Sequence, residues 1–90
     1  MSGVTEANTT EADYTAAIAA ELKAEKAASA LTIDALAEST GISSRQVVRI
    51  LRGERTANYS LILAFCDAFK LDISDFNRRV QDRYRKQRGE

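Results

Sequence analysis

The chain has 90 residues and a formal net charge of zero, with 13 Lys or Arg against 13 Asp or Glu. A chain of this length buries only about 60 to 65% of its unfolded surface, which suits one domain and leaves no room for a large enzyme cleft. One cysteine and no histidine exclude an intramolecular disulfide and a Cys/His zinc cluster, and they remove the commonest general base. We therefore expect no metal, no cofactor and no enzymatic activity.

The charges are divided unevenly along the chain. Residues 1–40 hold two Lys or Arg and seven Asp or Glu, whereas residues 41–90 hold eleven and six, so the two parts carry −5 and +5. Such a division is typical of a protein with a polyanion-binding face, although a solvated charged surface produces it too. No secretory signal pattern and no apolar run of about 18 residues is present, so we expect a cytoplasmic protein without a membrane partner.

The N-terminal part predicts a tail and one helix. Residues 1–9 are small, polar and acidic without a hydrophobic period, which indicates a disordered tail. Thr10 is a plausible N-cap for a first helix that places Ile18 and Leu22 on one face up to about Ser29. The remaining chain, residues 10–88, is then a single domain.

Residues 32–53 predict two short helices joined by a tight turn. Thr32 is the N-cap of a helix through Ser39, and Gly41 supplies the left-handed position that ends it. Ser43 then caps a helix over residues 43–52, with Gln46 three residues later completing a capping box, and Gly53 ends this helix. The pattern is that of a helix-turn-helix.

The C-terminal part predicts two more helices. Asn58 caps a fourth helix, and Asp72 caps a fifth helix over residues 73–88. The fourth helix carries a core-facing stripe, and the fifth carries an apolar stripe surrounded by basic residues. These stripes are Ile62, Phe65, Cys66 and Phe69, and Ile73, Phe76, Val80 and Tyr84. Five helices and no strand-like alternation indicate an all-α fold, in which Cys66 is a small buried hydrophobe.

The outer face of helix 43–52 carries the chemistry of base recognition. Arg45, Val48, Arg49 and Arg52 are spaced i, i+3, i+4 and i+7 on it, with Ser44 and Gln46 near the helix start. Arg suits guanine, Gln can pair with adenine, and a Val methyl can meet the methyl of thymine. Three arginines on a lone helix are more often a solvated face, but their place beside a glycine turn favours DNA.

Further residues are suited to phosphate contacts. Short polar side chains and backbone amides between the third and fourth helices can hold phosphates at a helix N-terminus. The candidates are Ser43, Arg52, Arg55, Thr56 and Asn58. Asn58 can serve as N-cap and phosphate ligand together, because the cap uses only its side-chain oxygen.

The stretch from Leu22 to Phe76 resembles the phage lambda repressor and Cro type of helix-turn-helix domain, also called the xenobiotic-response-element family. The resemblance rests on the pair Leu36 and Ala37, on Gly41, on Val47 and Ile50, and on Gly53 with the apolar helix that follows. It implies a compact five-helix lambda-repressor-like fold and base contacts from the start of helix 43–52. It also implies transcriptional regulation of phage or bacterial genes, with repression the expected direction.

The resemblance also implies a homodimer on a double-stranded operator with an inverted repeat. A fifth helix builds the dimer interface in several family members, so Phe76, Val80 and Tyr84 are interface candidates, with packing against the chain's own core as their alternative. One departure concerns Ile33, which stands where the family often has a phosphate-binding Gln. The alternative function is a protein-binding module, such as an antitoxin or an antagonist of another regulator, whose basic fifth helix grips an acidic partner.

Overall fold

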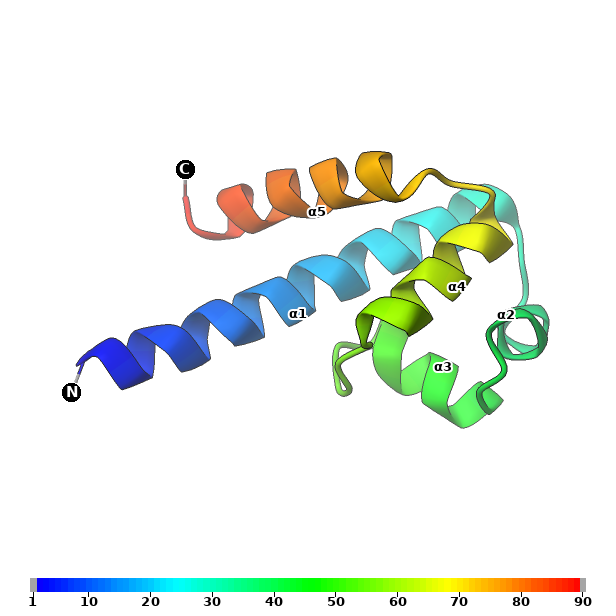
Figure 1. The fold of residues 1–90 in the computed structure, drawn as a ribbon, viewed down its shortest axis with the longest axis horizontal. Helices are drawn as coiled ribbons and strands as arrows, with labels where there is room; N and C mark the ends of the chain where they lie inside the picture. The colour runs from blue at the N-terminus through cyan, green and yellow to red at the C-terminus, as the bar shows by residue number, and fades with distance from the viewer. Residues whose placement is uncertain (1, 90) are drawn as a thin grey trace.

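The chain folds into five α-helices connected by short turns (Figure 1). The computed structural model describes residues 2–89, and it describes side chains from residue 13 to residue 89. No strand occurs in that range, so the predicted all-α fold is confirmed. The helices are α1 (Ser2–Ser29), α2 (Ile33–Thr40), α3 (Ser44–Leu51), α4 (Tyr59–Phe69) and α5 (Ile73–Gln87).

The last four helices begin at the caps that the sequence predicted. The side chains of Thr32, Ser43, Asn58 and Asp72 each accept a hydrogen bond from a backbone N–H of the first turn that follows. Such bonds satisfy donors that a helix N-terminus otherwise leaves unpaired. Gly41 follows α2 with φ of +79° and donates its N–H to the carbonyl of Ala37, so it ends α2 in the left-handed conformation that glycine adopts at low cost.

The predicted start of the first helix was wrong. The helix α1 begins at Ser2, so Thr10 is not its N-cap, and residues 2–9 continue the helix where the sequence indicated a disordered tail. Residues 4–12 contain no Gly or Pro, and the Ala and Glu among them favour a helical backbone. A threonine that could act as a cap therefore does not interrupt the helix.

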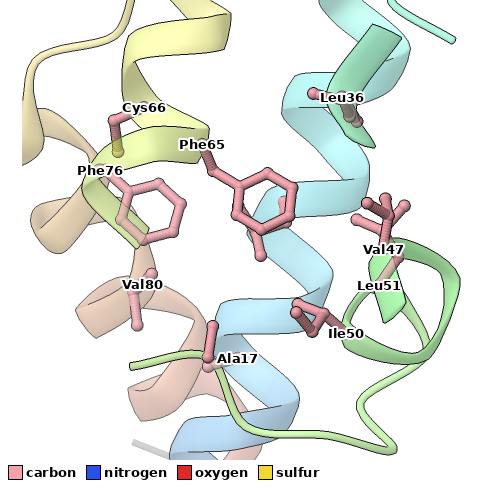
Figure 2. Packing of buried hydrophobic residues seen from close by; sticks show 11 residues of the cluster. Ala17, Leu36, Val47, Ile50, Leu51, Phe65, Cys66, Phe76 and Val80 are labelled. Atoms are coloured by element: carbon pink, nitrogen blue, oxygen red, sulfur yellow. The ribbon is translucent and has the colours of Figure 1, made fainter. Parts of the chain in front are cut away.

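The helix α1 lies between the two halves of the remaining chain. Figure 1 shows α5 running along one side of α1, whereas α2 and α3 lie on the other side and α4 crosses between them. In the close view of Figure 2, Phe65 of α4 lies at the centre of the core. Leu36 and Val47 lie on one side of it, and Phe76 and Val80 lie on the other. One continuous core thus joins the helix-turn-helix to α5 through α1 and α4.

None of the described helices is both long enough and apolar enough to cross a lipid bilayer.

Candidate nucleic-acid interface

The helix-turn-helix is held by a small set of fully buried side chains. Leu36 of α2 and Val47 of α3 have no exposed surface, and Ile50 of α3 is nearly as buried. Burying side chains of this size stabilises a fold by about 1.5 to 3 kcal/mol each. The inner face of α3 is therefore fixed against the domain, and its opposite face points to solvent.

The solvent-facing side of α3 is strongly basic. Arg45, Arg49 and Arg52 are all exposed, and none of them forms an ion pair within the described part of the chain. Val48 lies between them, half-buried but outside the core cluster. Residues three and four apart lie next to one another on a helix surface, so the four side chains form one contiguous outer face.

Two polar residues near the start of α3 are held by side chains from elsewhere in the chain. The hydroxyl of Ser44 donates to Oδ1 of Asp34 at 2.7 Å, and Nη1 of Arg55 donates to Oε1 of Gln46 at 2.6 Å. The predicted capping box is therefore only half formed, because Ser43 Oγ accepts from the N–H of Gln46 whereas the Gln46 side chain turns to Arg55. A charged donor makes a stronger hydrogen bond than a neutral backbone N–H.

Three of the predicted phosphate contacts, Arg55, Thr56 and Asn58, lie between α3 and α4, whereas Ser43 and Arg52 cap the two ends of α3. Asn58 Oδ1 accepts from the N–H of Leu61 at 2.8 Å, which leaves the amide NH₂ of Asn58 as a donor. Arg55 and Asn58 line an open hollow together with Thr40 and Ser60. The Thr56 side chain is exposed and contacts the hydroxyl of Thr15 at 3.4 Å. The hollow offers several hydrogen-bond donors to an oxyanion.

Asp34, Thr40 and Ser60 are further polar residues near these sites that the sequence pattern alone did not indicate. Ser60 could have been predicted, because it lies in the first turn of the helix whose N-cap, Asn58, was predicted. Asp34 could not have been predicted in this way, because it is ten residues from Ser44 in sequence. The two side chains contact each other only because α2 packs against α3. Ile33, which stands where related domains often carry a phosphate ligand, is half-buried against the core.

The candidate dimer residues lie mostly in the core of the chain itself. Phe76 and Val80 are only 1% and 6% exposed and pack within the core of the chain. Tyr84 is half-buried and stacks on Tyr14 of α1, with ring centroids 3.9 Å apart and planes 5° apart. The alternative of internal packing thus describes the placement of Phe76 and Val80, because α5 lies against α1 and must cover it.

Two of the basic residues of α5 pair with acidic residues of α1. Arg83 Nε lies 2.8 Å from Glu21 Oε1, and Arg79 Nη1 lies 2.5 Å from Glu25 Oε2. Arg78 pairs with Asp75 on α5 itself. The opposite charges of the two chain halves therefore meet in one interface, and α5 offers fewer unpaired cations to an acidic partner than its sequence suggested.

Two observations concern metal binding and the reactivity of Cys66. No group of three or more His, Cys, Asp or Glu side chains could hold a metal ion there. Burial raises the pKa of the Cys66 thiol to about 11, and the charge of Asp67 adds to the shift. A thiol that stays protonated at neutral pH is a poor nucleophile.

Two short helices, α2 and α3, are joined by a tight turn, bury their inner faces and expose the basic outer face of α3. This arrangement is typical of helix-turn-helix domains. A family model described as "Helix-turn-helix domain" matches residues 17–78, and the chain therefore belongs to this family. Among solved structures, the chain is similar to the clp gene regulator ClgR from Corynebacterium glutamicum, at 21% identity and a TM-score of 0.79, over 84% of this chain and 81% of that one. No curated protein sequence matches the chain.

Proposed function

We propose that the protein is a sequence-specific regulator of transcription that binds double-stranded DNA by inserting α3 into the major groove. The observation that carries this proposal is the outer face of α3, where Arg45, Arg49 and Arg52 are exposed without a carboxylate partner in the described chain. Unpaired arginines on one helix face contribute little to stability. They suit guanine edges and phosphates, which arginine binds through two parallel hydrogen bonds.

The arrangement around α3 supports a division of roles. Ser44, Arg45, Gln46, Val48 and Arg49 are the proposed base-reading residues, because they belong to the first turns of α3. The proposed phosphate contacts surround them at the caps of α3 and α4, where backbone donors and short polar side chains meet. Phosphate contacts of this kind fix the position of a protein on the duplex without reading sequence.

The operator is proposed to be an inverted repeat bound by a homodimer, with half-sites about one helical turn, ~34 Å, apart. Occupancy of such a site would repress transcription of the gene it overlaps, in the cytoplasm and on the nucleoid. The structural neighbour is itself described as a gene regulator. Because Phe76 and Val80 are in the core, the proposed dimer needs another surface. Light scattering of the protein on a full repeat and on a half-site separates a 2:1 complex from a 1:1 complex.

The test of DNA reading is a titration followed by fluorescence anisotropy. The protein is added to a randomised duplex pool and to sequences selected from it, at several salt concentrations. We expect selected sequences to bind far more tightly than the pool, and we expect an Arg45→Ala/Arg49→Ala variant to lose that preference. The matched control is Arg85→Ala/Lys86→Ala, which removes two exposed charges from α5 and should leave the preference intact.

Weak binding that depends steeply on salt, yields no preferred sequence and is unchanged in the Arg45→Ala/Arg49→Ala variant contradicts the proposal. Such a result would leave phosphate attraction as the only DNA interaction. A protein partner for the domain would then be the hypothesis to pursue.

A further inference from the structure

The two hydrogen bonds that hold Ser44 and Gln46 have a defined direction. Arginine carries five N–H donors and no acceptor, so Gln46 must meet Arg55 with its oxygen. A carboxylate accepts only, so Ser44 must give its hydroxyl proton to Asp34. These directions follow from the chemistry of the partners and need no observed hydrogen atoms.

The directions set which group of each side chain has no partner inside the described chain and is available for DNA. Gln46 keeps its NH₂ as a donor, while the oxygen that a paired adenine contact needs is engaged by the guanidinium of Arg55. Ser44 keeps oxygen lone pairs as acceptors, while its only proton is engaged by Asp34. In the major groove, acceptors for Gln46 are N7 and O6 of guanine, N7 of adenine and O4 of thymine. Donors for Ser44 are the amino groups of cytosine and adenine.

We propose that Arg55 and Asp34 are specificity-determining positioning residues, which set Gln46 as a donor and Ser44 as an acceptor toward the base edges. This inference rests on the proposed DNA-binding function and deepens it. It changes the expected preference of Gln46, because the two-bond contact with adenine would have to share its oxygen with Arg55. It also gives Arg55 a second role, since the guanidinium has further N–H groups for a phosphate.

The test compares base preferences of variants. The wild type is selected on a randomised duplex pool, and every single-base-pair change of the selected site is titrated with Gln46→Ala and Ser44→Ala to find the pairs that each residue reads. Arg55→Ala should relax the preference at the Gln46 pair by about fivefold or more, and adding Gln46→Ala should relax it no further. Arg55→Lys keeps a donor for the Gln46 oxygen and should restore part of the preference.

Arg52→Ala is the matched control for Arg55, because Arg52 is also exposed and makes no side-chain hydrogen bond in the described chain. It should weaken binding equally for all sequences, as loss of a phosphate contact does. For Asp34, the alanine variant should relax the preference at the Ser44 pair, whereas Asp34→Asn keeps an acceptor for Ser44 and should preserve it. Glu38→Gln removes a charge from the same helix and should change no preference.

The outcomes separate the two proposals. If the wild type selects no sequence, the proposed function and this inference both fail. If the wild type selects a site but Arg55→Ala and Asp34→Ala keep every base preference, only the inference is overturned, and Arg55 is then a phosphate contact alone. The melting temperature of each variant checks that it is folded. We expect little change for Arg52, Arg55, Asp34 and Glu38, because these side chains are exposed.

Discussion

At the scale of single residues, the backbone conformation of Lys70 stands out. Lys70 ends α4 with φ of +56° and ψ of 43°, in the left-handed region that costs a residue with a Cβ about 1 to 2 kcal/mol. Gly41 occupies the equivalent region after α2 without that cost. The two helices thus end in the same way with different residues.

We therefore expect Lys70→Gly to raise the free energy of unfolding by about 0.5 to 1 kcal/mol, the gain in the folded state being partly offset by the larger entropy of the unfolded chain. Urea denaturation followed by circular dichroism measures it. Lys70→Ala removes the same charge and keeps the Cβ, so it should give no comparable gain. An equal gain from both variants would assign the effect to charge and contradict this explanation.

At the scale of helices, the sequence predicted the parts that depend on near neighbours. Caps at Thr32, Ser43, Asn58 and Asp72 and the apolar stripes of α4 and α5 are local signals, because each cap side chain bonds a backbone N–H only two or three residues further along the chain. Contacts between helices were not predictable in this way. The stacking of Tyr14 on Tyr84 joins residues 70 positions apart, and it depends on how α1 and α5 cross.

The interface between α1 and α5 also contains Glu21, which is only 3% exposed. Burial raises the pKa of this carboxyl above its ordinary value of 4.5, more than its hydrogen bond to Arg83 lowers it. In the pH range between the ordinary and the raised pKa, the native state binds more protons than the unfolded chain. The contribution of Glu21 to the free energy of unfolding therefore increases as the pH falls through that range.

The Glu21→Gln variant lacks this titration. The melting temperature of the wild type should consequently rise relative to Glu21→Gln as the pH is lowered toward 4.5. Glu25 behaves in the opposite sense, because hydrogen bonds with Glu21 and Arg79 lower its pKa. Relative to Glu25→Gln, the wild type should lose stability as the pH falls from 5 to 3. A difference between wild type and Glu21→Gln that stays constant as the pH falls from 7 to 4.5 would contradict the assigned direction of the shift.

At the scale of the whole molecule, α5 is a structural part of the domain. Phe76 joins the same core as Leu36 and Val47, so Phe76→Ala should lower the free energy of unfolding by about 3 to 5 kcal/mol. Since the lost contacts are within one chain, this change should be the same at low and high protein concentration. A loss that grows as concentration rises would instead place Phe76 in a subunit contact.

The distribution of charge over the molecule leads to a prediction about salt. Figure 1 shows α5 and α3 on opposite sides of α1 and α4, and three arginines of α5 are engaged in ion pairs. The α3 side, where Arg45, Arg49 and Arg52 are exposed and unpaired within the described chain, is therefore the side expected to follow the DNA backbone. Replacing Arg52 with Gln should reduce the slope of log K against log salt by about 1.

Replacing Arg85 and Lys86 of α5 with Gln changes the net charge of the molecule twice as much, and it should leave that slope unchanged. Counterions are released only where cations approach phosphates, and the Debye length of about 8 to 10 Å at moderate salt limits the influence of distant charges. Anisotropy titrations at four salt concentrations measure both slopes. A slope change in the Arg85/Lys86 variant about twice that of the Arg52 variant would mean that the net charge of the domain, and not the face of α3, governs its attraction to DNA.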